Sequence, residues 1–433
     1  MKLQIEKMVY GGAGLAHPTE GEAGAVFVPF TLPGELVEAR FIEKKSDHDE
    51  ASLLNVLTAS KDRTDPGCKH FGECGGCHYQ HAKYPAQVNI KTAILQDAME
   101  HVGLTALPKI QPHTGEQWGY RNRTRLRVEE IEGTLKVGYN RRGSNQFLAI
   151  QECPIIAPLL WRAAAILLRV AADNSTSGRW AQTISEVEFF TTADEKKLQM
   201  SVFVQKKSQT GFADFCEHMK EEIPELTGAG SLLASPKSPQ RQMQKARPLE
   251  DWGAKGLSYQ AAHEDYWVGR GSFFQVNRFL VEELIAIVTK GHQGKLAWDL
   301  YAGVGLFSKQ LAKEFQQIVA VEAAGSDLTN SFRGSGKRAV EATAVEFLRN
   351  AVVQRERPEL IVIDPPRAGV GPEVCSFLAR IAAPEIIYVS CDPITLARDL
   401  KMLVDAGYNI VELHFVDLFP QTFHLETVVI LRR

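Results

Sequence analysis

The sequence predicts a multidomain α/β protein, and three stretches of the chain carry that prediction. Short alternating apolar runs separated by glycine-rich turns fill residues 1–60, which indicates a small β domain. Residues 61–265 combine a cysteine-rich segment with mixed helical and strand patterns, which indicates an α+β domain. Over most of residues 266–433, apolar runs alternate with helical patterns, as in a parallel sheet covered on both faces.

Composition limits the class of protein. A chain of 433 residues with 44% apolar and 23% charged residues is ordinary for a soluble globular protein of two or three domains. The net charge of −3 argues against a protein that coats nucleic acid over its whole surface. The chain shows neither an apolar run of the ~20 residues that a membrane span needs nor a signal-peptide pattern at its start. We therefore expect a cytoplasmic monomer without membrane contact.

The first domain reads as a small barrel. Its apolar positions alternate within the runs LQIEKMVY, AGAVFVPF and GELVEARFIEKK, and the turns GGAG and LPGE separate them. Short strands joined by glycine-rich turns are typical of barrels of the oligonucleotide-binding kind. The segment KDRTDPG then reads as a linker.

The second domain opens with a helical pattern. Residues 86–104 predict an amphipathic helix that ends near Gly103, and we expect it to pack on the third domain. Helical and strand patterns alternate over residues 155–230. The polar, proline-bearing residues 232–253 predict a loop.

The same domain contains a strand with arginine at every second position. The stretch YRNRTRLRV places these side chains on one strand face: Arg121, Arg123, Arg125 and Arg127. The pattern fits a solvated sheet face and equally a surface for RNA phosphates. Arg121 and Arg123 are our candidates for RNA contact.

The cysteines suggest a metal centre. An odd number of cysteines in a chain without an export signal argues against disulfides. The spacing C-x5-C-x2-C with a distant fourth cysteine is a strong metal signal, and its candidate ligands are Cys68, Cys74, Cys77 and Cys153. Tetrahedral zinc and an iron–sulfur cluster both accept four thiolates. Three neighbouring histidines keep zinc open: His70, His78 and His81. Cys216 and Cys375 read as core residues.

The third domain begins with a nucleotide-binding pattern. A strand ends within WDLYAGVGLFS, and Gly303 and Gly305 then open a helix, so that the backbone can approach a ligand closely. The next strand ends at Glu322, about 20 residues after Gly303, where a carboxylate can accept hydrogen bonds from ribose hydroxyls. These features predict a site for a nucleotide or S-adenosylmethionine.

Two later strand ends carry reactive side chains. Cys391 stands where a strand stops and a helix begins, and we expect the positive end of that helix to favour its thiolate. Glu426 lies at the edge of the last strand. Next to a methyl donor, this pair suits methylation of uracil carbon 5: the thiolate adds at carbon 6, and a base then removes the proton on carbon 5. The DPP motif at Asp364 resembles that of amino methyltransferases, but Arg367 replaces their usual aromatic residue.

These motifs resemble those of the RNA uracil-5-methyltransferases, in particular the iron–sulfur branch that methylates 23S ribosomal RNA. The resemblance covers nearly the whole chain and includes GGAGLA, VFVPFTLPGELV, FGECGGCHYQH, SFFQVN, DLYAGVG, IDPPRAG, SCDP and HLETVV. It implies a TRAM RNA-binding barrel over residues 1–60. It further implies a central α+β RNA-binding domain with the cluster over 61–265 and a class I, Rossmann-like methyltransferase domain over 266–433.

The resemblance also implies roles for individual residues. Cys391 would be the nucleophile and Glu426 the general base, acting on a uridine extruded from its stack. The S-adenosylmethionine contacts would be Gln275, Tyr301, Glu322 and Asp364. Phe273 would lie near the target base. The four clustered cysteines would hold a structural [4Fe–4S] cluster.

Three alternatives remain at this stage. The chain could methylate uridine 54 of tRNA, because the chemistry is identical. It could be a non-catalytic, redox-sensing iron–sulfur RNA-binding protein, although the Cys391–Glu426 pair argues against this. Amino methylation would leave Cys391 unexplained.

Overall fold

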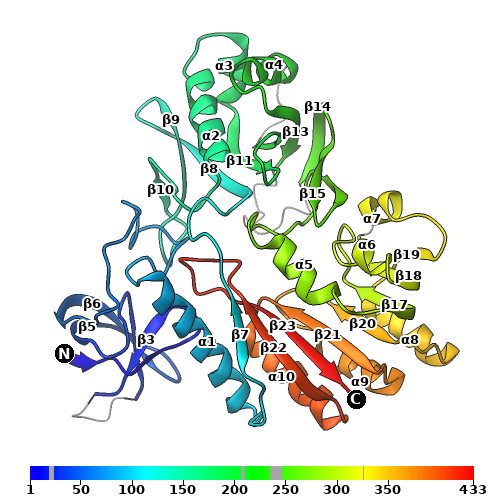
Figure 1. The fold of residues 1–433 in the computed structure, drawn as a ribbon. Coiled ribbons are helices and arrows are strands. Elements are labelled where there is room, and N and C mark those ends of the chain that lie inside the picture. The colour runs from blue at the N-terminus through cyan, green and yellow to red at the C-terminus, as the bar shows by residue number, and fades with distance from the viewer. Residues whose placement is uncertain (19–23, 206–209, 235–245, 325) are drawn as a thin grey trace.

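The computed structural model describes residues 1–18, 24–205, 210–234, 246–324 and 326–433, arranged as three sheet-bearing units (Figure 1). Residues 235–245 of the expected loop at 232–253 lie outside this description. None of the helices in these ranges is both long and apolar enough to cross a lipid bilayer.

The N-terminal unit is a six-stranded sheet in the order β1-β5-β6-β4-β3-β2. Its strands are β1 (Lys2–Gln4), β2 (Lys7–Met8), β3 (Ala13–Ala16), β4 (Val26–Pro29), β5 (Leu36–Lys44) and β6 (Asp49–Thr58). Alternate apolar side chains such as Val26, Val28 and Val37 form its own small core. The turn between β2 and β3 contains Gly11 and Gly12 at φ 108° and 89°, a conformation that favours glycine.

The central unit is a seven-stranded, mostly antiparallel sheet in the order β10-β9-β8-β11-β12-β13-β14. Its strands are β8 (Arg123–Ile131), β9 (Thr134–Asn140), β10 (Phe147–Ala149), β11 (Ile184–Thr191), β12 (Leu198–Val204), β13 (Leu226–Leu233) and β14 (Arg247–Gly253). Its helices α2 (Pro158–Ala171), α3 (Thr176–Ala181) and α4 (Phe212–Glu222) form one apolar core with this sheet. The alternation predicted for the arginine strand is confirmed in β8, where every second side chain is buried.

The strand β14 corrects one sequence expectation. We expected a loop over residues 232–253, but residues 247–253 pair with β13 along its antiparallel edge. Their mostly exposed polar side chains and Pro248 hid the strand, because an edge strand needs neither an apolar face nor every backbone donor. Hydrogen bonding to β13, rather than the composition of residues 247–253, therefore makes this segment a strand.

The C-terminal unit is an eight-stranded sheet in the order β19-β18-β17-β20-β21-β23-β22-β7. Its strands are β7 (Ile110–His113), β17 (Gly294–Leu300), β18 (Phe315–Glu322), β19 (Lys337–Glu341), β20 (Leu360–Ile363), β21 (Glu385–Ser390), β22 (Asn409–Val416) and β23 (Glu426–Arg432). The neighbours from β19 to β21 are parallel, whereas β23 runs antiparallel between β21 and β22. The expected parallel α/β arrangement is confirmed.

The helices of this unit are α5 (Val281–Thr289), α6 (Ser308–Leu311), α7 (Ser326–Ser331), α8 (Ala344–Gln354), α9 (Gly371–Ile381) and α10 (Pro393–Asp405). The hairpin of β15 (Gly256–Ala261) and β16 (Glu264–Gly269) packs into the same apolar core as α5 and precedes it in the chain. The core splits into two clusters, one on each face of the sheet. Covering both faces buries the strands almost completely, as their apolar sequences require.

The predicted helix at 86–104 is present as α1 (Tyr84–His101), with Gly103 at φ 84° just beyond its end. It packs beside α10, and the following β7 pairs in parallel with β22 (Figure 1). Residues 84–113 thus join the sheet of the C-terminal unit, although our expected boundaries assign them to the central domain.

Candidate active site

The candidate site residues gather at one edge of the C-terminal sheet. Tyr301, Asp364 and Cys391 directly follow the parallel strands β17, β20 and β21, and Glu322 ends β18. Because β23 is antiparallel, its first residue, Glu426, lies at the same edge. The topology therefore brings five residues together from segments far apart in the sequence, at the place where open α/β sheets bind ligands.

Cys391 and Glu426 are neighbours across two paired strands. Ser390 of β21 pairs with Thr427 of β23, so Cys391 and Glu426 come next to each other in the register. Burial, then the charge of Glu426, raises the pKa of the Cys391 thiol to about 12. Burial, followed by Asp364, raises the pKa of Glu426 well above its ordinary value. The guanidinium of Arg367 opposes both shifts, so it is a cation that stabilises the charged forms of the pair.

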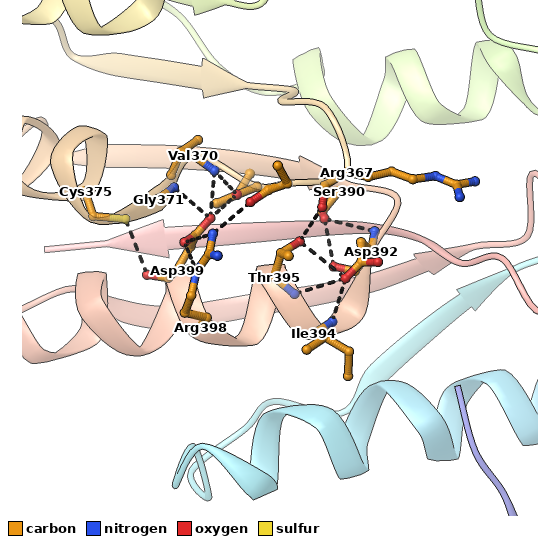
Figure 2. Close-up of polar contacts among 12 residues, drawn as sticks. Arg367, Val370, Gly371, Cys375, Ser390, Asp392, Ile394, Thr395, Arg398 and Asp399 are labelled. Carbon is orange, nitrogen blue, oxygen red and sulfur yellow. Dashed lines mark hydrogen bonds and ion pairs between the residues drawn. The ribbon is translucent and has the colours of Figure 1, made fainter. Parts of the chain in front are cut away.

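Asp392 occupies the helix terminus next to Cys391. It is the N-cap of α10: its Oδ1 accepts hydrogen bonds from the backbone N–H groups of Ile394 at 3.1 Å and Thr395 at 3.0 Å (Figure 2). This carboxylate also raises the pKa of Cys391. The expectation that the helix end favours a thiolate does not hold for the pKa of Cys391, which burial and then Glu426 raise; Asp392 occupies the helix-end donors and adds a smaller contribution of the same sign.

The loop after Asp364 is tied to α10. Thr395 Oγ1 donates to the carbonyl of Arg367 at 2.9 Å, and buried Asp399 accepts from the backbone N–H of Val370 at 2.8 Å. The hydroxyl of Tyr388 donates to the same Asp399 oxygen at 2.7 Å. The side chain of Arg367 points away from this network (Figure 2), and its guanidinium lies 3.3 Å from Nδ1 of His424.

The loop after β17 forms a cradle. The backbone N–H of Gly303 donates to Glu322 Oε2 at 3.0 Å, which closes the loop onto the end of β18. Tyr301 and Gly303 both have positive φ, 64° and 56°, and a Cβ at Gly303 would meet no described heavy atom within 4 Å. This open space lets a ligand approach the backbone, so the expected S-adenosylmethionine site fits the residues present.

Sequence reasoning missed Asp299 in this cradle. It lies inside β17, fully buried, and burial raises its pKa to about 7. Ser308 donates to one of its oxygens, but Oδ1 has no hydrogen-bond partner among the described residues. A carboxylate that follows buried apolar residues of β17 was the available signal. The pKa of Asp364 is likewise raised to about 7, by burial and then by Asp299.

The SFFQVN segment is an irregular loop rather than the buried strand that its composition suggests. Phe273 is 67% exposed, whereas Gln275 is buried. Asn122 Nδ2 donates to the carbonyl of Gln275 at 2.9 Å, and Arg123 donates to the carbonyl of Ser272 at 2.6 Å. The start of β8 therefore holds the loop that presents Phe273.

The arginines of β8 differ in their surroundings. Arg123 is half-buried, and its guanidinium lies 4.2 Å from the ring centre of Phe190. Its side chain thus has an intramolecular role, and an RNA contact by Arg123 stays a prediction. Arg121, which precedes β8, lines a cavity of about 810 Å³ together with Arg125 and Arg127.

The four candidate metal ligands line that same cavity: Cys68, Cys74, Cys77 and Cys153. All seven cysteines are free, and the predicted core residues Cys216 and Cys375 are buried. Within the described ranges, no three or more Cys, His, Asp or Glu side chains are grouped closely enough to hold a single metal ion. A zinc ion needs its ligands within about 2.3 Å, whereas a cluster binds each thiolate through a separate iron.

The three histidines near these cysteines have other partners. His70 Nε2 accepts from the backbone of Gln151 at 2.9 Å, His81 Nε2 lies 3.2 Å from the carbonyl of Thr31, and His78 packs on Phe423. The Nδ1 atoms of His78 and His81 are buried without a hydrogen-bond partner among the described residues, so the structure does not separate zinc from an iron–sulfur cluster, and the cluster stays a prediction.

Comparison with known proteins agrees with this geometry. A family model described as tRNA (Uracil-5-)-methyltransferase matches residues 83–349 and 337–433. An uncharacterized RNA methyltransferase of Thermotoga maritima is 31% identical over 99% of this chain and 98% of its own. The 23S rRNA (uracil(1939)-C(5))-methyltransferase RlmD of Chromohalobacter salexigens is 30% identical over 100% of this chain and 89% of its own.

A solved structure shares the fold. The tRNA (uracil-54, C5)-methyltransferase of Pyrococcus abyssi, crystallised with S-adenosyl-L-homocysteine, superposes with a TM-score of 0.76 over 100% of both chains. The two sequences are 21% identical, so this likeness supports the architecture alone.

Proposed function

From the premise that the chain belongs to the RNA (uracil-5-)-methyltransferase family, we propose that it methylates carbon 5 of a specific uridine in 23S ribosomal RNA. The chain is an S-adenosylmethionine-dependent RNA methyltransferase. The observation that carries the proposal is the pairing of β21 with β23, which sets Cys391 beside Glu426 at the ligand edge of the sheet.

The chain's own side chains divide the reaction between them. The Cys391 thiol first gives its proton to solvent, and the thiolate then adds to carbon 6 of the uracil, which leaves an enolate whose carbon 5 is a nucleophile. S-Adenosylmethionine supplies the electrophilic methyl group. Glu426 then removes the surplus proton from carbon 5, the carbon 5–carbon 6 double bond re-forms, and the Cys391 thiolate leaves. Arg367 stabilises the thiolate form of Cys391 and the carboxylate form of Glu426.

Four residues hold the methyl donor in this proposal: Gln275, Tyr301, Glu322 and Asp364. The open space above Gly303 and the unpartnered Oδ1 of Asp299 support a ligand in this cradle. Glu322 already accepts from the backbone of Gly303, and a carboxylate has further lone pairs for ribose hydroxyls.

The central unit supplies RNA contacts and a cluster site in this proposal. Exposed Phe273 meets the target base, which is extruded from its stack, and Arg121 faces RNA phosphate. The four cavity cysteines hold a [4Fe–4S] cluster, which serves as a structural crosslink because methyl transfer needs no electron. The N-terminal unit is a TRAM barrel that grips RNA.

The relatives named RlmD, which align over nearly the whole chain, support ribosomal RNA as the substrate. The name of the family model and the Pyrococcus abyssi structure favour tRNA as the second candidate. The Cys391 chemistry is the same for both.

The test is transfer of labelled methyl groups into unmodified total RNA, fractionated into large ribosomal RNA and tRNA. We expect 5-methyluridine in the 23S fraction. The same nucleoside in tRNA alone would overturn the substrate, and no transfer by anaerobically prepared protein would overturn the activity.

The mechanism has its own test with RNA that contains 5-fluorouridine. Fluorine replaces the hydrogen at carbon 5, so the base has no proton to remove and the adduct with the protein stays trapped. Wild-type protein should form a covalent adduct and Cys391→Ala none. The matched control Cys216→Ala changes a buried cysteine of the central core and should form the adduct normally. A Cys391→Ala variant that still methylates RNA would refute the nucleophile.

A further inference from the structure

The N-terminal unit reaches directly to the segment that carries Cys391. Tyr10, in the turn between β2 and β3, donates its hydroxyl hydrogen to Asp392 Oδ2 at 3.0 Å. The two residues are 382 positions apart in the chain. Asp392 follows Cys391 and caps α10, so this bond joins the first sheet of the molecule to the nucleophile's immediate neighbour.

Asp392 is fixed from two sides. Its Oδ1 holds the first turn of α10 through Ile394 and Thr395, while its Oδ2 is held by Tyr10. On the other side of Cys391, Ser390 Oγ accepts from the backbone N–H of Asp392 at 3.2 Å and donates to its carbonyl at 3.1 Å. Cys391 therefore sits in a short turn whose geometry depends on how Asp392 is held.

Tyr10 is itself firmly seated. Its ring meets Phe423 edge-on with centroids 5.3 Å apart, and Phe423 also contacts His78 of the cysteine segment, with centroids 4.6 Å apart. A Cβ at Gly12 would lie 3.1 Å from Cβ of His78, so the β2–β3 turn packs closely on the same segment. Burial and the Asp392 charge raise the pKa of Tyr10, which keeps its hydroxyl a donor.

We propose that Tyr10 is a positioning residue for the nucleophile: through its hydrogen bond to Asp392 it holds Cys391 in the orientation needed to attack the uracil. This inference rests on the proposed function, because it assigns Tyr10 a role in that attack. If Tyr10 has this role, the rate of attack by Cys391 depends on how the N-terminal unit packs against the C-terminal unit, in addition to any contact of the N-terminal unit with RNA.

The test is Tyr10→Phe, which keeps the ring against Phe423 and removes only the donor. At saturating RNA we expect the rate of adduct formation with 5-fluorouridine RNA to fall about 10- to 100-fold, because small displacements of a reacting group cost this much. RNA affinity and S-adenosylmethionine binding should change less than about twofold. The control Asp97→Asn breaks the exposed ion pair between Lys7 of the same unit and α1, and should leave the adduct rate unchanged.

A second arm tests the route through Asp392. Asp392→Ser keeps a good helix cap but is too short to reach Tyr10. We expect it to slow adduct formation, and adding Tyr10→Phe should then cost less than about twofold. The single variant Asp392→Ser leaves the N-terminal unit untouched, so an Asp392→Ser protein that forms the adduct as fast as wild type overturns the proposal even if Tyr10→Phe folds poorly.

The outcomes separate the two claims. Wild-type protein that forms no adduct overturns the proposed function. Wild-type protein that forms the adduct, with Tyr10→Phe equally fast or with fully multiplicative effects in the double variant, overturns only the role of Tyr10. An equal slowing by Asp97→Asn would show that any contact that docks the N-terminal unit has this effect, and it would also overturn the specific role of Tyr10.

Discussion

At the scale of single residues, the surroundings of Cys391 and Glu426, the proposed nucleophile and base, raise the pKa of both side chains. Burial is the main cause for both Cys391 and Glu426, and Arg367 opposes it in both cases. A carboxyl with a raised pKa is a better proton acceptor once ionised, and a protonated thiol is protected from adventitious oxidation.

Glu426→Gln should separate the two halves of the reaction. The amide cannot accept the carbon 5 proton, so the enzyme should still join Cys391 to RNA but release the product at least about 100-fold more slowly. Single-turnover assays with ordinary RNA should show the protein–RNA adduct accumulating on denaturing gels. Rapid turnover without accumulation would remove Glu426 from its role. Glu412→Gln, at a carboxylate outside the site, is the control.

The raised pKa of Cys391 predicts a distinctive pH dependence. Attack needs the thiolate, and with a pKa of about 12 the thiolate fraction grows about tenfold per pH unit across the neutral range. The rate of adduct formation with 5-fluorouridine RNA should thus still be rising at pH 9. An ordinary cysteine, with a pKa of about 8.5, would give a plateau there. A plateau below pH 8 would show that the thiol is ionised before attack.

The sequence could suggest which residues form the site, but not how they are held. Motif resemblance singled out Cys391 and Glu426, and the structure brings the two residues side by side, while their roles stay a prediction. The contact of Tyr10 with Asp392 could not be foreseen, since neither residue belongs to a recognisable local pattern. For Arg123, periodicity predicted the alternation of side chains along the strand. It could not predict that the guanidinium packs on the ring of Phe190, which lies on a strand distant in the sequence.

At the scale of elements, the antiparallel β23 is the feature that completes the site. A parallel strand would bring its carboxyl end to the ligand edge, whereas β23 brings its first residue, Glu426. Buried strands such as β20 and β21 were predictable because continuous apolar runs leave few alternatives. Edge strand β14 was not, since the pairing partner β13 determines it rather than its own composition.

The helix α1 is fastened to the C-terminal sheet by a buried ion pair. Lys91 of α1 donates to Asp417 Oδ1 at 2.7 Å and to the carbonyl of Phe419 at 2.9 Å, and both charged side chains are fully buried. Burial lowers the pKa of Lys91 while Asp417 opposes the shift. The segment that it grips, residues 417–425, leads from β22 directly into Glu426.

Lys91→Met should lower the free energy of unfolding by about 3–5 kcal/mol, because it leaves Asp417 buried without its counter-ion. The double variant Lys91→Met/Asp417→Leu should recover most of this loss. The control Lys401→Met breaks an exposed pair with Asp405 on α10 and should cost less than about 1 kcal/mol. Equilibrium denaturation measures all three. A double variant less stable than Lys91→Met would refute the account.

At the scale of the whole molecule, all three units converge on the segment 417–425. The backbone N–H groups of His78 and Tyr79, which follow Cys77, donate to the carbonyl of Gln421 at 2.8 and 3.0 Å. Gln87 of α1 exchanges two hydrogen bonds of 2.9 Å with Gln421, and Tyr10 packs on Phe423. Gln421 has a φ of 69°, a costly conformation that these contacts maintain. The cysteine segment thus supports the path to Glu426.

Loss of one cavity thiolate should therefore destabilise residues 417–425, which lead to Glu426 at the active-site edge. Cys153→Ser, purified without oxygen, should lose most of the about four irons per chain expected for wild type. Its melting temperature should drop, and hydrogen exchange at residues 417–425 should accelerate, because the His78 and Tyr79 donors lose their anchor in Cys77. S-Adenosylmethionine binding should persist, since its cradle lies across the sheet on β17 and β18. Cys216→Ala, in the central core, is the control and should keep its iron.

Unchanged exchange in an iron-free Cys153→Ser protein would show that the cluster site and the Glu426 segment are independent. Iron-free wild-type protein would refute the cluster.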